Sequence, residues 1–147
     1  MNVNDRGRAS RTAAWTLAAV ALAAAAPVSA DTLLSPKQQE VIARKTARSS
    51  PEEKAIIAGW SDARKLAEFF CAPSALAAFR KKEKGADRVS LGPDEAGTMK
   101  FVLVGNTRLS GRGTVRTPGH WKGYRFDCVL DPERGRVKSF AYDLDPT

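Results

Sequence analysis

The spacing of hydrophobic residues changes near residue 88 and divides the chain into a helical part and a strand part. Between residues 50 and 71 apolar side chains recur every three or four positions, which predicts one amphipathic helix. Its apolar face consists of Ile56, Ile57, Trp60, Ala63, Leu66, Ala67 and Phe70. Ser50-Pro51-Glu52-Glu53 marks the start, because it combines an N-cap serine, an early proline and a glutamate three residues after the cap. Pro73 is expected to end or kink this helix, with a short helical segment over 74–79 beyond it.

A similar start signal, Ser35-Pro36-Lys37-Gln38, precedes a more polar helix that reaches about Arg48. Val41 and Ile42 are its only large apolar residues. Because so narrow an apolar face buries little surface, we expect residues 31–49 to form a polar, loosely docked helix. Residues 50–147 are expected to form a single α+β domain, in keeping with a chain of 147 residues.

From Arg88 onward apolar and polar residues alternate, the pattern of half-buried strands. The predicted strands cover residues 89–91, 99–104, 107–117, 122–130 and 140–144. Thr117-Pro118-Gly119-His120 and the segment 131–135, which ends in Gly135, are typical of tight turns. The expected fold class is therefore α+β, with N-terminal helices packed on a small C-terminal antiparallel β-meander.

The first thirty residues have the organisation of a secretory signal peptide. Three arginines precede residue 12, residues 13–26 are almost entirely alanine, leucine and valine, and Pro27-Val28-Ser29-Ala30 provides small residues for cleavage after Ala30. An uncleaved membrane anchor is the alternative, but fourteen helical residues span roughly 21 Å of a hydrocarbon core about 30 Å thick. We therefore expect a periplasmic or secreted protein with no membrane span after signal cleavage.

Export changes the chemistry expected of the two cysteines, Cys71 and Cys128, which lie 57 positions apart. In an oxidising compartment such a pair predicts a disulfide, with two buried thiols as the alternative. Cys71 follows the apolar helical face and Cys128 lies on the apolar side of a strand, so the bridge would join helix to sheet. One histidine and two oxidised cysteines are too few for a zinc site, and we expect neither a metal nor a cofactor.

The chain is basic, with 24 Lys and Arg against 16 Asp and Glu and a net charge of +8. The most suggestive cationic cluster comprises Arg108, Arg112, Arg116, Lys122 and Arg125. Its arginines share the solvent-side parity of two adjacent predicted strands, and Lys122 lies near the connecting turn. Such a face could bind carboxylates, phosphates or an envelope polysaccharide. The alternative is an ordinary solvated face on which Asp127 neutralises neighbouring arginines.

A second basic run consists of Arg80, Lys81, Lys82 and Lys84, directly before Gly85. It is either an anion-binding patch or, as we favour, a set of cations that stabilise the carbonyl end of a helix. Nucleic acid is not an expected partner of an exported protein.

The sequence lacks an arrangement typical of a catalytic site. His120 lies in a predicted turn, and the chain contains no Gly-x-Ser-x-Gly motif. Gly111 and Gly113 do not form a nucleotide-binding loop and are expected to mark a bulge or the close approach of an aromatic ring. The carboxylates that a hydrolase would need, Asp127, Asp131, Asp143 and Asp145, are predicted at strand ends and turns, where solvated acids are usual.

Several residues between Cys71 and Leu144 match a known pattern. They are Cys71 with Ala75-Leu76, then Asp87-Arg88-Val89, the glycines around Gly111 and Gly113, and the run Trp121, Phe126, Cys128, Val137, Ser139, Phe140 and Tyr142. In these residues the chain resembles the domain of unknown function 930, a family of short exported bacterial proteins. The resemblance implies export, a helix-plus-sheet fold and the two cysteines, and it implies no activity or catalytic residue.

These observations predict a small exported, non-enzymatic binding or structural module that uses a basic sheet face to contact an anionic envelope component. The alternative is an accessory subunit or inhibitor of an envelope enzyme, with residues 31–48 becoming ordered on a protein partner. A deep cleft around the acidic residues would favour an enzyme, a flat basic face a binding module, and an exposed apolar patch an accessory subunit. The sequence does not indicate an oligomeric state.

Overall fold

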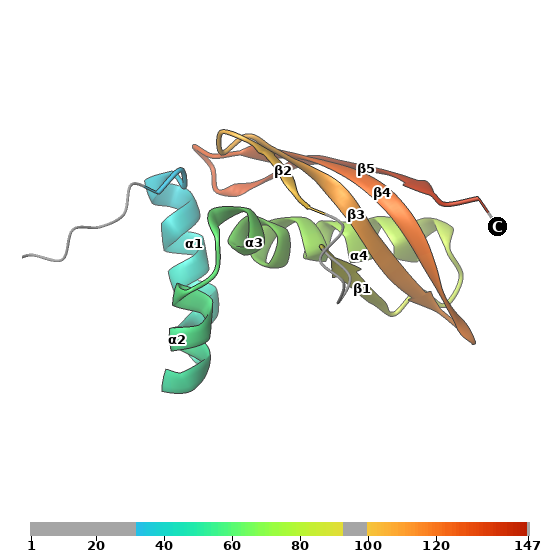
Figure 1. The fold of residues 1–147 in the computed structure, drawn as a ribbon, viewed down its shortest axis with the longest axis horizontal. Helices are drawn as coiled ribbons and strands as arrows, with labels where there is room; N and C mark the ends of the chain where they lie inside the picture. Colours follow the sequence, from blue (N-terminus) through green and yellow to red (C-terminus); the bar gives the residue numbers. More distant parts are fainter. Residues whose placement is uncertain (1–31, 93–99, 147) are drawn as a thin grey trace, which may run out of the picture. The chain divides into compact units, whose positions relative to one another are not determined.

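The computed structural model describes residues 32–92 and 100–146, and the predicted signal peptide lies outside them. Helices occupy the N-terminal half of these residues and a five-stranded antiparallel sheet occupies the C-terminal half (Figure 1). The α+β fold predicted from the spacing of hydrophobic residues is therefore confirmed. The helices are α1 (Pro36–Thr46), α2 (Pro51–Ala58), α3 (Asp62–Leu66), a π-helical turn η1 (Ala67–Cys71) and α4 (Ala72–Lys82).

Serine caps determine where the first three helices begin. Ser35 and Ser50 each form a complete capping box at the start of α1 and α2, as the sequence predicts. The single helix expected between residues 50 and 71 is wrong, however, because α2 ends at Ala58. Ser61 caps a new helix by accepting a hydrogen bond from the Arg64 N–H, at 3.2 Å, and thereby favours a restart of the chain as α3.

Pro73 does not end the helix, which is the first of the two outcomes that the sequence predicts, since α3, η1 and α4 follow one another directly. In a regular α-helix the proline ring would clash with the carbonyl four residues earlier, that of Phe69, which would also lose its N–H partner. The wider π turn precedes the proline, with the Ala72 N–H bonded to the Ala67 carbonyl. Lys45 of α1 donates a hydrogen bond to the Phe69 carbonyl and so gives that group a partner.

The sheet comprises β1 (Arg88–Leu91), β2 (Val102–Val104), β3 (Arg108–Thr117), β4 (His120–Asp131) and β5 (Arg136–Leu144). Strands β2 to β5 form the predicted antiparallel meander. β1 pairs with residues 113–116 of β3 and β2 pairs with residues 108–110. Because β4 occupies the whole other edge of β3, β1 and β2 follow one another along a single edge.

The core lies between the helices and one face of the sheet. The buried residues of β4 are Tyr124, Phe126, Cys128 and Leu130, as their alternation predicts. A disulfide between Cys71 and Cys128, with the two Cα atoms 6.0 Å apart, joins η1 to β4 and confirms the predicted link between helix and sheet. Gly113 allows Tyr124 to pack closely, because a Cβ atom there would lie 2.8 Å from the phenol ring.

The position of α1 differs from the loosely docked helix that its few apolar residues predict. Val41 and Ile42 are buried, and so is Gln38, which has no exposed surface. The Gln38 amide nitrogen donates to the Asn106 carbonyl at 2.9 Å, and the Ser35 hydroxyl donates to the Pro132 carbonyl at 2.6 Å. A buried, hydrogen-bonded polar side chain therefore fastens this helix to the turns of the sheet, an anchor that a count of apolar residues does not detect.

Candidate functional site

The structure places four of the five predicted site residues on the face of the sheet that points away from the helices. Arg112 lies directly opposite Arg125, while Arg108 lies opposite Val129 and Arg116 opposite Trp121. Directly opposed residues of antiparallel strands point to the same side. The intervening residues of β3, such as Leu109 and Val115, are buried. We refer to the surface carrying Arg108, Arg112, Arg116 and Arg125 as the arginine face.

Three of these arginines are bound to carboxylates. Arg108 makes a two-pronged pair with Asp127, with N–O distances of 2.7 and 2.6 Å. Arg116 binds Asp87 in the same way at 2.8 and 2.7 Å, and Arg112 pairs with Asp145. The hydrogen bond from Arg116 lowers the pKa of Asp87 below its ordinary value. The charge of the arginine face is therefore largely compensated.

Gly123 makes one of these pairs possible. A Cβ atom on Gly123 would lie 2.2 Å from a carboxylate oxygen of Asp145, so only a glycine leaves room for this side chain on β4. The backbone N–H of Asp145 also donates to the Gly123 carbonyl at 2.9 Å. The ion pair that compensates the charge of Arg112 thus depends on a glycine in β4.

Arg125 is the arginine of this face that, among residues 32–92 and 100–146, has no carboxylate within 4.0 Å. It lines a hollow of about 180 Å³ together with Asp127 and, from β5, Asp143. This hollow is smaller than the cavities of roughly 300–1,000 Å³ that usually bind small molecules. Asp131 lies apart from it, at the end of β4, where its carboxylate accepts from the Arg134 N–H at 3.1 Å.

Lys122, the fifth predicted residue, does not join the arginine face. It lies opposite the buried Val115 and therefore points toward the helices. Its ammonium group is 3.4 Å from the carboxylate of Glu83, at the end of α4. The parity that Lys122 shares with the buried Tyr124 is the sequence signal that places it on this inner side.

Uncompensated positive charge gathers instead where α4 meets β1. We name Arg80, Lys81, Lys82, Lys84 and Arg88 the helix-end cluster, and all five are exposed. Within the part of the chain that the structure describes, none of the five has a carboxylate within 4.0 Å. The two acids of this segment, Glu83 and Asp87, are bound to Lys122 and Arg116 from the sheet.

The lone histidine lies at the turn between β3 and β4, where its Nε2 atom is 3.4 Å from the Thr117 hydroxyl. Across residues 32–92 and 100–146, no three His, Cys, Asp or Glu side chains lie together in a way that could hold a metal ion. No helix within these same limits combines the length and the apolar character needed to cross a membrane.

Comparison with known proteins adds no relative: no family model, no curated protein and no solved structure matches the chain. The resemblance to the domain of unknown function 930 stays a prediction.

Proposed function

We propose that this protein is an exported, non-catalytic binding module for an anionic partner, and that the helix-end cluster is its contact surface. The observation that carries the proposal is the distribution of ion pairs. Three arginines of the arginine face are already bound to carboxylates, whereas the helix-end cations have no such partner among the described residues.

The surroundings of the helix-end cluster leave its positive charge available to a partner. Residues 80–88 contain five cations and two carboxylates. Because Lys122 and Arg116 neutralise those two carboxylates, the positive charge of the segment is not cancelled locally. Exposed like charges close together create a positive potential that attracts a polyanion and weakens as salt increases. A repeated carboxylate or phosphate polymer of the cell envelope has the matching chemistry.

Export is the second part of the proposal. Cys71 and Cys128 are fully buried and form a disulfide, a bond that persists mainly in oxidising compartments. Together with the leader-like sequence over residues 1–30, this supports a location in the periplasm or outside the cell.

The test compares two triple variants that each lower the net charge by three. One carries Arg80→Gln, Lys81→Gln and Lys84→Gln, and the other carries Arg108→Gln, Arg112→Gln and Arg125→Gln. Arg116 is left intact because it binds Asp87, whose charge also interacts with Arg80. Binding to polygalacturonate and to polyphosphate is measured by calorimetry at several salt concentrations, with melting temperatures as a control for folding.

We expect the helix-end variant to bind at least about tenfold more weakly, since each exposed ionic contact contributes up to about 1 kcal/mol. The sheet variant should lose less than about threefold, because two of its three arginines are already paired. Equal losses would show a general effect of net charge, and a larger loss in the sheet variant would place the site on the arginine face. Either result overturns the assignment to the helix end, and no binding of either polymer at low salt overturns the function.

A second candidate is the accessory subunit, which an exposed apolar patch would favour. Val102 and Val104 of β2 are 59% and 58% exposed. Val102 is paired with Ser110 and Val104 with Arg108, so both valines point to the same side of the sheet as the arginine face. This small apolar strip suits contact with another protein, and Val102→Thr with Val104→Thr should abolish a complex that depends on it while leaving polyanion binding intact.

A further inference from the structure

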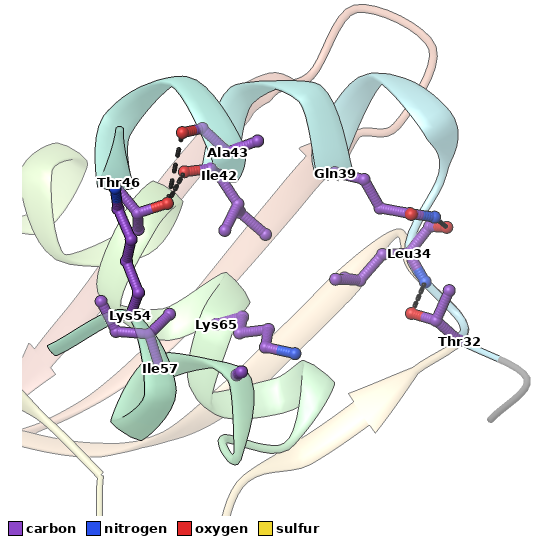
Figure 2. A pocket seen from close by; sticks show the side chains of 10 residues that line it. Thr32, Leu34, Gln39, Ile42, Ala43, Thr46, Lys54, Ile57 and Lys65 are labelled. Atoms are coloured by element: carbon purple, nitrogen blue, oxygen red, sulfur yellow. Dashed lines mark hydrogen bonds between the residues drawn. The ribbon is translucent and has the colours of Figure 1, made fainter. Parts of the chain in front are cut away.

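A pocket with a mainly apolar lining lies between α1, α2 and α3. Its volume is about 310 Å³, at the lower end of the range typical of ligand pockets. Leu34 and Ile42 extend into it from the α1 side and Ile57 lines it from α2 (Figure 2). Three branched apolar side chains from separate segments thus surround one space.

The polar side chains that line this pocket are already hydrogen-bonded within the protein. The Gln39 amide donates to the Leu34 carbonyl at 3.0 Å. The Thr46 hydroxyl bonds to the Ile42 and Ala43 carbonyls at 3.0 and 3.2 Å. A ligand with many hydrogen-bonding groups would find few partners here, and burying such groups unpaired is costly. The pocket therefore favours a mainly apolar ligand.

Two lysines supply the remaining chemistry. Lys54 from α2 and Lys65 from α3 both line the pocket, and Figure 2 shows the Lys65 side chain crossing its lower side. Neither ammonium group has a carboxylate within 4.0 Å among residues 32–92 and 100–146. The nearby Asp62 carboxylate instead accepts hydrogen bonds from the Thr32 hydroxyl and the Leu33 N–H. The two side chains run to different sides of the pocket, Lys54 toward Thr46 and Lys65 along the opposite side (Figure 2). An anionic group beside Lys65 would give this ammonium group a partner of opposite charge.

We propose that this pocket binds a single-chain amphiphile, with a short acyl chain between Leu34, Ile42 and Ile57 and an anionic head group at Lys65. The apolar lining favours the acyl chain, and the ammonium group of Lys65 favours a negatively charged head group. This site shares no residue with the helix-end cluster, so a test of it does not depend on whether the protein binds a polyanion.

The experiment measures binding of decanoate by calorimetry, with decanol and decyltrimethylammonium as neutral and cationic controls. Lys65→Gln should weaken decanoate binding about tenfold, because hydrogen bonds to charged groups are strong, and should leave decanol binding nearly unchanged. Lys81→Gln, an equal charge change in the helix-end cluster, should leave decanoate binding unchanged. A negative heat-capacity change should accompany binding as apolar surface is buried.

A matched pair of variants on α2 tests the position of the acyl chain. Ala58 lines the pocket and Ala55 does not, although both are exposed on the same helix. Ala58→Leu should fill the space and reduce the affinity for decanoate at least about tenfold, whereas Ala55→Leu should change it less than about twofold.

Several results would contradict binding of an anionic amphiphile in this pocket. Absence of decanoate binding, equal binding of the cationic amphiphile, or unchanged affinity in Lys65→Gln would each overturn the proposal. Equal effects of the two leucine substitutions would show that the chain binds elsewhere and would overturn it as well. If Ala58→Leu unfolds the protein, the comparison of Lys65→Gln with Lys81→Gln decides, since both replace lysines that form no ion pair within the described ranges.

Discussion

Gln38 offers the sharpest test of how the N-terminal helix is held. Its side chain has no exposed surface, and both ends of the amide are used. The oxygen accepts from the Ser35 N–H at 2.9 Å and the nitrogen donates to the Asn106 carbonyl at 2.9 Å. Gln38→Ala removes two hydrogen bonds, each worth about 1 kcal/mol, and leaves a cavity in place of the side chain. We expect the free energy of unfolding to fall by about 2–4 kcal/mol, a large part of the roughly 5–15 kcal/mol typical of a domain.

The assay is urea denaturation followed by circular dichroism, with two companion variants. Gln38→Met keeps most of the volume while removing both hydrogen bonds, so about 2 kcal/mol of the loss should remain. Gln39→Ala is the matched control, because the neighbouring glutamine is exposed and donates a single hydrogen bond, to the Leu34 carbonyl. It should cost less than about 1 kcal/mol.

Equal stability of Gln38→Ala and Gln39→Ala, to within about 0.5 kcal/mol, would refute this role of Gln38. That result would mean that α1 contributes little to the folded state, as its few apolar residues predict. A full loss in Gln38→Ala with none in Gln38→Met would show that packing, rather than the two hydrogen bonds, holds the helix.

Three further predictions address the core and the paired charges. Replacing both Cys71 and Cys128 by alanine should lower the free energy of unfolding by about 4 kcal/mol through loop-closure entropy over their separation of 57 residues, and unchanged urea denaturation would contradict this. Tyr124→Phe should be neutral or stabilising by up to about 1 kcal/mol, because within the described residues the buried hydroxyl has no hydrogen-bond partner; thermal unfolding checks this, and a clear loss would reveal a partner. Because pairing with Arg116 holds the pKa of Asp87 below its ordinary value of 3.8, the stability it contributes is present above that value and is lost as pH falls through the lower folded pKa. Arg116→Gln should therefore be less stable than the parent protein at pH 7 and should approach it in strong acid, as melting curves across pH would show; a difference that persists in strong acid would rule out this ion pair as its cause.

Local sequence patterns correctly predict much of the fold. The caps at Ser35 and Ser50 were predictable because their hydrogen bonds reach only three residues along the chain. The buried side of β4 was predictable because successive strand residues point to opposite faces. Both signals involve residues of one short segment, in which neighbours along the sequence are also neighbours in space.

The helix breaks were less predictable because competing local signals have similar strengths. Ser61 is an N-cap inside an apolar repeat, and the chain starts a new helix there instead of continuing the first one. Pro73 would end most helices, yet a π turn and the ammonium group of Lys45, which lies 24 residues from the carbonyl it binds, preserve this one. Neither element of that arrangement is visible in the residues beside the proline.

The candidate site shows the same division between local pattern and tertiary contact. Alternation along the strands correctly gathered Arg108, Arg112, Arg116 and Arg125 on one side of the sheet, because parity is a local property. Which of them carry available charge depends on carboxylates 19 to 33 residues away in sequence. Sequence by itself thus determined where the charges point, and only the tertiary structure decided which are neutralised, since ion pairing depends on distances between segments that folding brings together.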